Sequence, residues 1–110
     1  MSNEKKLIRK NFRDACFKRD KYSCVMCGFK SSKDKAEEEL DAHHITNPKK
    51  IINSGFTPLN GISLCSECHI KAEKFHSTGT PVEGYSVEDL YKKINSSLEK
   101  AIEASEKLKP

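Results

Sequence analysis

The sequence predicts a small α+β domain that is stapled by a zinc site and flanked by a helix at each end. Three observations predict it: helical apolar spacing near both ends of the chain, two short strand-like segments in the middle, and two Cys-x-x-Cys pairs. With 110 residues, 35% of them hydrophobic, and no Trp, the chain has the size of one domain but little material for an apolar core. We therefore expect a metal to supply part of the stability.

The first predicted element is an amphipathic helix over residues 4–19, with Ile8, Phe12 and Cys16 at helical spacing. Residues 1–35 hold 11 Lys and Arg against four acidic residues, a charge of +7, whereas the remainder carries −3. A basic first third is the electrostatic footprint of a nucleic-acid-binding protein, although a solvated lysine-rich surface explains the charge alone equally well. The side chains expected to contact nucleic acid are Arg9, Lys10, Arg13, Lys18 and Arg19.

The middle of the chain alternates between short elements and turns. A turn-rich knuckle and a polar loop come first, and two short strands enclose a loop rich in Pro, Asn and Gly. A helix follows, with Ser66 as its expected N-cap. The expected bounds are 22–35 for the knuckle and loop, 40–45 and 62–65 for the strands, 46–61 for the second loop and 66–76 for the helix.

One long helix is expected over residues 86–108, because its apolar positions follow a 3.6-residue period. Ser86 and Asp89 stand at the two positions of a capping box at its start. The apolar stripe is expected to pack on the domain or on a partner helix. We accordingly divide the chain into residues 1–80, a zinc-stapled domain with its basic helix, and residues 81–110, the C-terminal helix.

The two cysteine pairs have the spacing of a zinc site: Cys24 and Cys27, then Cys65 and Cys68. Four thiolates fill a tetrahedral shell, so this zinc would be structural. A pair of redox motifs is the alternative. The fifth cysteine, Cys16, lies on the apolar face of the first helix and is expected to be a core residue.

The histidines predict a second metal site. His69, Glu73 and His76 fall on one face of the helix that starts at the second cysteine pair, and a His and a carboxylate four residues apart can bind one ion. If the two strands pair, His43 or His44 faces that helix, because neighbouring strand residues point to opposite faces.

One Cys-x-x-Cys pair precedes the segment DAHHI, and the other lies inside the segment NGISLCSECH. With this arrangement the chain resembles the HNH endonucleases over about residues 13–76. The resemblance implies a ββα-metal (His-Me finger) fold, in which a hairpin and a helix grip one catalytic divalent ion. It implies that His43 and His69 bind the ion, that His44 is the general base and that Asn60 steadies the loop and the base. Asp41 would be a supporting acidic residue. Some relatives have a further His where this chain has Glu73, so Glu73, His76, or water and phosphate would complete the site.

These observations predict a metal-dependent endonuclease that hydrolyses phosphodiester bonds of DNA. The expected cofactors are one structural Zn²⁺ and one catalytic Mg²⁺, Mn²⁺, Ni²⁺ or Zn²⁺. The alternative is a non-catalytic zinc-finger-like module that binds nucleic acid or protein, and a third interpretation is a scaffold subunit that dimerises or binds a partner through the C-terminal helix. The sequence contains no apolar run long enough for a membrane span and no secretory signal, so a cytoplasmic protein of a bacterium or a phage-infected host is expected.

Overall fold

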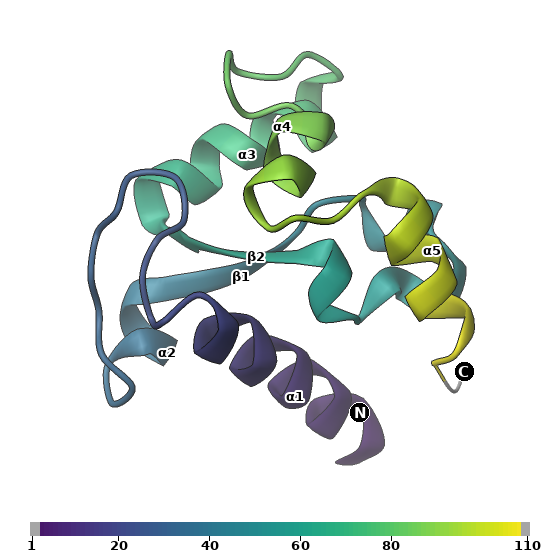
Figure 1. Cartoon of the computed structure of the whole chain (residues 1–110), viewed down its shortest axis with the longest axis horizontal. Helices are drawn as coiled ribbons and strands as arrows, with labels where there is room; N and C mark the ends of the chain where they lie inside the picture. Colours follow the sequence, from purple (N-terminus) through teal and green to yellow (C-terminus); the bar gives the residue numbers. More distant parts are fainter. Residues whose placement is uncertain (1–2, 109–110) are drawn as a thin grey trace.

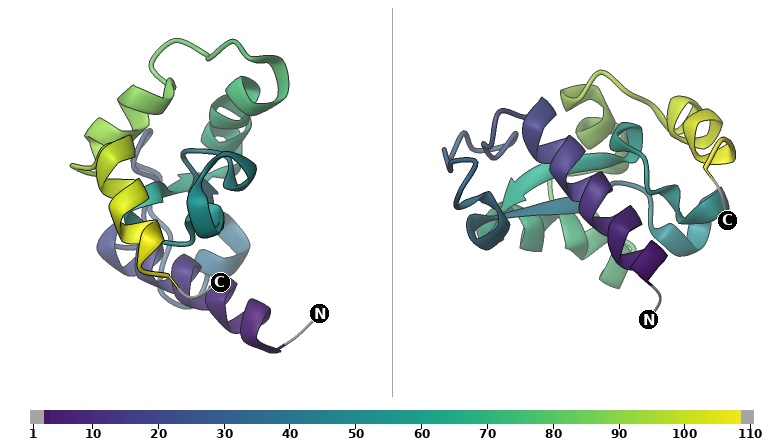
Figure 2. Two further views of the ribbon diagram at one scale, coloured as in Figure 1. Left: turned by 90° about the vertical axis from the view of Figure 1, so that its right-hand side faces the viewer. Right: turned by 90° about the horizontal axis from the view of Figure 1, so that it is seen from below.

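The computed structural model describes residues 3–108 and confirms the α+β fold (Figure 1). Two antiparallel strands, β1 (Leu40–His44) and β2 (Gly61–Cys65), form a hairpin, and helix α3 (Ser66–Thr78) follows directly. Helix α1 (Asn3–Arg19) lies on one side of the hairpin and α3 on the other (Figures 1 and 2). The hairpin is therefore the middle layer, and each of its faces is covered by a different helix.

The register of the hairpin decides which side chains face which helix. Leu40 pairs with Cys65 and His44 with Gly61. Because side chains alternate along a strand, Asp41 and His43 point towards α3, while His44 points towards α1. Helix α1 approaches β2 closely at Gly61, where any Cβ would overlap the side chains of α1.

An ion pair at the end of α1 fastens that helix to the hairpin. The Arg19 guanidinium donates to the carbonyls of Pro58 and Gly61 at 2.6 and 2.7 Å and pairs with Asp20 at 2.7 Å. The Asp20 carboxylate in turn accepts a hydrogen bond from the Ser63 N–H at 3.0 Å. Charge-assisted bonds of this kind fix geometry well, so Arg19 has a structural role in addition to any contact with nucleic acid.

The C-terminal segment is two helices, so the single helix expected over residues 86–108 is wrong. Helix α4 spans Val87–Lys93 and α5 spans Leu98–Glu106. Asn95 between them has a φ of 54°, outside the right-handed helical region, and the Ser97 side chain accepts from the Lys100 N–H and so starts a new helix. The capping box at the start of α4 is confirmed.

The apolar stripe of both helices packs on the domain itself. Leu90, Tyr91 and Ala101 are buried in the same core as Leu64 and Ile62 of β2. The stripe keeps a helical period across the break because α4 and α5 turn their apolar sides to one core. Leu98, which also belongs to this apolar stripe, is half exposed.

The other differences from the expected elements are local. Helix α3 begins at the expected residue, but the N-cap differs: Cys65 is the N-cap and makes no side-chain cap, and Ser66, the expected N-cap, is the first helical residue. A short helix, α2, lies between the predicted loop and β1, in residues for which no element was predicted. The loop between the strands contains three short 3₁₀ turns. These elements are α2 (Ala36–Glu39), η1 (Pro48–Lys50), η2 (Ile52–Gly55) and η3 (Pro58–Asn60). Within residues 3–108, no helix combines the length and the apolar character that a membrane span requires.

Candidate active site

The four predicted zinc ligands come together at the start of α3. The Sγ atoms of Cys24, Cys27, Cys65 and Cys68 all lie within 4.8 Å of one another, and those of Cys27 and Cys65 are 3.6 Å apart. Four thiolates at zinc-bonding distance in a tetrahedron stand about 3.8 Å apart, so the cluster has the dimensions of a zinc site. The first pair sits on a tight turn that Gly28 closes at a φ of 83°.

The surroundings of the cysteines shift the pKa values of two of the thiols in opposite directions. Burial raises the pKa of Cys24, but the backbone N–H groups of Cys27, Cys65 and Met26 lower it by more, to about 7. Burial raises the pKa of Cys68 to about 12 in the same cluster. A divalent cation would hold all of these thiols in the ionised form. The Tyr85 hydroxyl donates a hydrogen bond to the Cys68 Sγ at 3.3 Å, so it supports the cluster from outside.

A second group of metal-binding side chains spans β1 and α3. His43, His69 and Glu73 each bring one ligand atom to within 4.8 Å of the others. Glu73 Oε1 lies 3.0 Å from His43 Nδ1 and 3.3 Å from His69 Nε2. An ion among these atoms would replace those hydrogen bonds. Asp41 Oδ2 lies 3.1 Å from His69 Nδ1 and holds that ring, as carboxylates behind metal-binding histidines commonly do.

His43 is neutral, which a metal ligand must be. Its side chain is fully buried, and burial, followed by the neighbouring His69, His76 and His44, lowers its pKa to about 3. The contact with Glu73 is therefore a hydrogen bond from a neutral ring rather than an ion pair. His43 Nε2 is buried with no hydrogen-bond partner among residues 3–108, a costly state that marks a group with a role beyond packing.

His76 lies beside this group but is not part of it. Its ring stacks on that of His43 with centroids 5.3 Å apart, and its Nε2 donates to the His44 carbonyl at 3.1 Å. Of the two residues expected to complete the ion site, Glu73 is the one whose oxygen converges with the histidine nitrogens. His76 connects α3 to the end of β1 and packs against His43.

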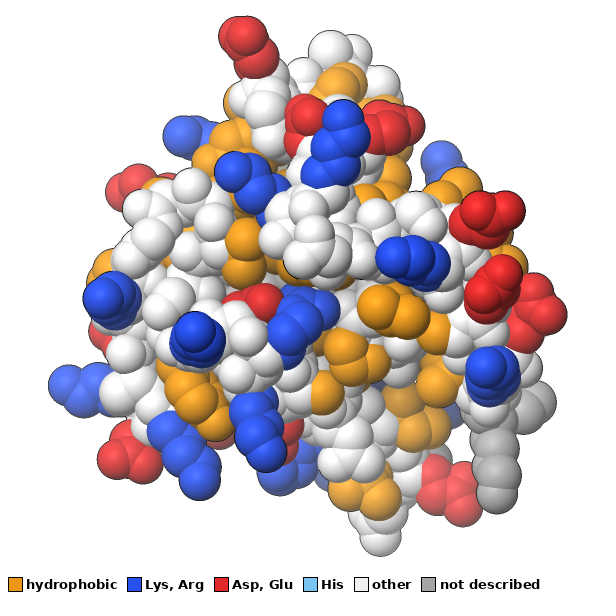
Figure 3. Space-filling view, viewed as in Figure 1, with side chains coloured by type: hydrophobic (Ala, Val, Ile, Leu, Met, Phe, Trp, Pro, Cys, Tyr) orange, Lys and Arg blue, Asp and Glu red, His pale blue; other side chains and the backbone are white. Residues whose placement is uncertain are grey.

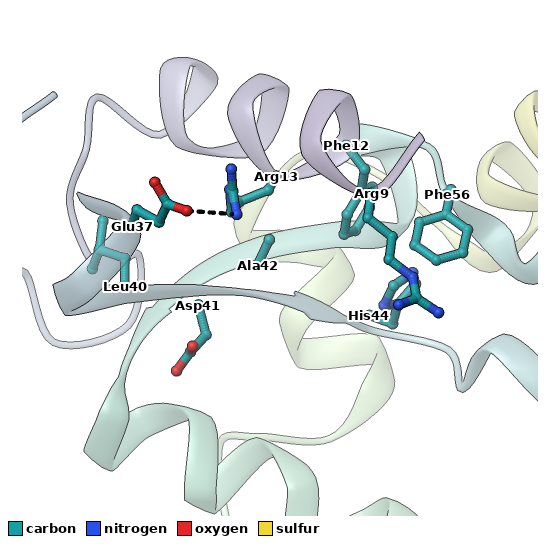
Figure 4. Close-up of a pocket in the computed structure, with 9 residues that line it drawn as sticks. All are labelled: Arg9, Phe12, Arg13, Glu37, Leu40, Asp41, Ala42, His44 and Phe56. Atoms are coloured by element: carbon teal, nitrogen blue, oxygen red, sulfur yellow. Dashed lines mark ion pairs between the residues drawn. The ribbon is translucent and has the colours of Figure 1, made fainter. Parts of the chain in front are cut away.

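His44 faces the other side of the hairpin, into an open groove of about 470 Å³ (Figure 4). Its ring stacks on Phe12 of α1, with centroids 4.5 Å apart and 15° between planes, and meets the edge of Phe56 at 4.7 Å. Burial, followed by His76 and Arg9, lowers the pKa of His44 to about 4, so the ring is neutral at pH 7. Its Nε2 is buried and has no hydrogen-bond partner within the described residues.

Two of the predicted basic residues line the same groove. Arg9 extends from α1 to lie beside His44, whereas Arg13 extends towards Glu37 (Figure 4). Arg13 Nη1 pairs with Glu37 of α2 at 3.3 Å across the groove. The other predicted residues lie elsewhere: Lys10 pairs with Asp14 at 2.6 Å, Lys18 is exposed, and Arg19 holds the hairpin. In the view of Figure 3, Lys and Arg side chains gather over α1 and the loop that follows it.

Asn60 is fully buried between the two strands' ends, and its amide has four partners. Its Oδ1 accepts from the Thr46 N–H at 2.9 Å and the Tyr91 hydroxyl at 2.7 Å. Its Nδ2 donates to the carbonyls of Thr46 and Gly55 at 3.1 and 3.2 Å. Asn60 thus steadies the loop after His44 in the way the resemblance implies, through backbone contacts.

The domain is of the ββα nuclease type. Its hairpin and helix bring His and Glu side chains together, and a four-cysteine cluster lies where the hairpin meets the helix. Residues 24–75 match the sequence model of the HNH endonuclease family, and the chain belongs to that family. No curated protein and no solved structure shows significant similarity to it. The matched residues contain the cysteine cluster, the hairpin and most of α3, whereas α1, α4 and α5 lie outside them.

Sequence reasoning missed three residues that surround the site. Phe56 packs on His44, Tyr91 bonds the Asn60 amide, and Tyr85 bonds Cys68. Tyr91 was recognised only as part of an apolar stripe, and its hydroxyl was the signal that it needs a polar partner when buried. Phe56 and Tyr85 lie in loops, where neither period nor spacing indicates a contact.

Proposed function

We propose that this protein is a metal-dependent endonuclease that hydrolyses phosphodiester bonds of DNA. One observation carries the proposal: the ligand atoms of His43, His69 and Glu73 converge within 4.8 Å of one another, and His44 is the next residue on the same strand. His43 joins His69 and Glu73 on the α3 side, and His44 faces a groove that contains arginines. The family to which the chain belongs supports the same conclusion.

On the α3 side, His43, His69 and Glu73 would hold a divalent ion. Bound there, the ion would supply positive charge to stabilise the oxygen that leaves the phosphorus. Two imidazoles and one carboxylate suit Zn²⁺, Ni²⁺ or Mn²⁺ better than Mg²⁺, which prefers oxygen ligands. Asp41 keeps the His69 ring in place by its contact with Nδ1. The fully buried His43 gives the group one rigid member.

On the groove side, His44 would accept the proton of the attacking water. Its lowered pKa, about 4, keeps the ring neutral at pH 7, so that one of its two nitrogens carries no proton and can accept one. Phe12 and Phe56 restrict the ring between them, so its orientation is set before substrate arrives. Arg9 and Arg13 would contact the phosphates on either side of the cleaved bond, as guanidinium groups commonly do.

A second candidate is a non-catalytic zinc module that binds nucleic acid. The four-cysteine cluster and the basic side chains favour it as much as they favour the nuclease. It leaves unexplained the His43, His69 and Glu73 group and the two ring nitrogens that are buried without partners. It also predicts that substitution of His44 has no effect on any measured activity.

The test is cleavage of supercoiled plasmid in Mg²⁺, Mn²⁺, Ni²⁺ or Zn²⁺, with a chelator control. We expect wild-type protein to nick or linearise the plasmid, and His44→Ala to lose that activity by at least about 100-fold. Lys92→Ala, which removes one exposed side chain of α4, is the control for surface changes. Binding without cleavage in every ion would overturn the proposal in favour of the zinc module.

A further inference from the structure

The hydroxyl of Tyr91 reaches the active-site loop from a helix outside the family's matched residues. Tyr91 lies on α4 and is 3% exposed. Its Oη donates to Asn60 Oδ1 at 2.7 Å and lies 2.6 Å from Thr46 Oγ1. Since the single phenolic proton goes to the amide oxygen, the Thr46 hydroxyl is the donor in the second contact. Tyr91 therefore contacts the side chains of two residues, one just after β1 and one just before β2.

These contacts extend the hairpin beyond its last strand pair. The Asn60 carbonyl accepts from the Ile45 N–H at 2.9 Å, and the Asn60 amide holds both the N–H and the carbonyl of Thr46. The backbone of both residues that follow His44 is thereby fixed. Ile45 is fully buried, which adds an apolar anchor at the same point. A change in the Asn60 amide would move this backbone, and His44 with it.

The Tyr91 hydroxyl adds a fourth hydrogen bond to the three that the Asn60 amide makes with backbone groups. Asn60 Oδ1 has two donors, and one of them is Tyr91. Without the hydroxyl, Oδ1 would keep only the Thr46 N–H, and the half-buried Thr46 hydroxyl would lose its acceptor. Buried polar groups that lose a partner rearrange to find another one.

We propose that Tyr91 is a positioning residue of the active site, which acts through Asn60 and Thr46 to fix the backbone that carries His44. The inference rests on the proposed function for its kinetic readout. It makes α4 part of the nuclease although the family match ends at residue 75. Tyr91 is a member of neither the groove lining nor the metal-binding group, so its effect is indirect.

The kinetic test uses Tyr91→Phe, which removes one oxygen atom and keeps the ring. We expect kcat for plasmid cleavage to fall about tenfold with KM nearly unchanged, because misplaced reacting groups slow the chemical step more than binding. Thr46→Val should act similarly, Thr46→Ser should retain wild-type activity, and the double variant Tyr91→Phe with Thr46→Val should be no worse than either alone. Tyr22→Phe, in the loop after α1, is the matched control.

A second readout separates this inference from the proposed function. The ring signals of the four histidines in ¹H–¹⁵N NMR spectra report the environment of each ring without any need for cleavage. In Tyr91→Phe we expect the His44 signals to shift and those of His69 to stay. Unchanged His44 signals would overturn the positioning role even if the protein cleaves DNA. A loss of activity that merely follows the unfolded fraction would overturn it too. If wild-type protein does not cleave, the proposed function fails while the NMR comparison still decides this inference.

Discussion

Phe12 lies flat against His44, with ring centroids 4.5 Å apart and 15° between the ring planes. The contact joins α1, which precedes the family's matched residues, to the histidine that we propose as the general base. His43, the next residue back, has its ring on the other side of the strand against α3. The pair of histidines in the sequence thus divides between two helices, and each helix restricts one ring.

Replacement of Phe12 should cost both stability and activity. Phe12 is 5% exposed, and Phe12→Ala should lower the free energy of unfolding by about 3 kcal/mol, through lost burial and the cavity left behind. Cleavage by the folded protein should also slow, because His44 loses one face of its support. Urea denaturation and plasmid cleavage are the two measurements. Leu7→Ala, an apolar truncation at an exposed position of the same helix, should change neither, and an equal effect of both variants would contradict the prediction.

The two metal groups should fail in different ways. Cys65→Ser removes one zinc ligand and should unfold the domain, as should a strong zinc chelator, because the thin core relies on the cluster. His44→Ala should stay folded and lose cleavage. Circular dichroism and zinc content measure the first effect, and plasmid cleavage measures the second. If His44→Ala lost as much helical signal as Cys65→Ser, this division of roles would be wrong.

The sequence allowed prediction of those parts of the site that depend on local pattern. Cysteine spacing predicted the four-thiol cluster, and strand alternation predicted that His43 and His44 diverge. The break between α4 and α5 was missed because the apolar period continues across it, and only Asn95 and the capping serine Ser97 mark the break. Helix propensity is a weak guide where both halves pack on the same core.

Contacts between residues far apart in sequence could not be predicted. Phe56 meets His44 because the loop between the strands folds back, and Tyr91 meets Asn60 across 31 residues. Arg19 was expected to bind nucleic acid by its charge, and its bonds to the Pro58 and Gly61 carbonyls depend on how α1 lies against β2. Charge predicts a partner of opposite sign, and the fold decides which partner is met.

Glu37 should weaken DNA binding by competing for Arg13. Its carboxylate lies 3.3 Å from Arg13 Nη1 at the groove (Figure 4), and a phosphate would need the same guanidinium. Glu37→Gln should therefore tighten binding about threefold at low salt, in line with the small energies of exposed ion pairs. Fluorescence anisotropy with labelled duplex DNA measures it, with both proteins compared in a His44→Ala background so that the DNA is not cleaved. Glu38→Gln removes the same charge from the same helix, and equal tightening in both variants would argue for a general charge effect instead.

The buried thiol of Cys16 should make the protein less stable at high pH. Cys16 is fully buried, and burial, which outweighs the opposing effect of Arg19, raises the pKa of its thiol to about 12. As the pH rises, the Cys16 thiol therefore ionises in the unfolded chain, with a pKa of about 8.5, before it ionises in the folded protein. The contribution to the free energy of unfolding is thus intact below about pH 8 and is lost as the pH rises towards 12, by up to about 1.4 kcal/mol per pH unit.

Cys16→Ala provides the comparison for this effect. Urea denaturation of both proteins between pH 7.5 and pH 10.5 should show a steeper fall in the free energy of unfolding for wild type. Other groups that titrate in this range are shared by the two proteins, so the difference in slope isolates Cys16. Iodoacetamide should label Cys16 only after urea is added, because the folded protein excludes the reagent and keeps the thiol protonated. Parallel pH curves, or labelling of Cys16 in the folded protein at the rate of the unfolded one, would show that α1 does not seal this residue against β2.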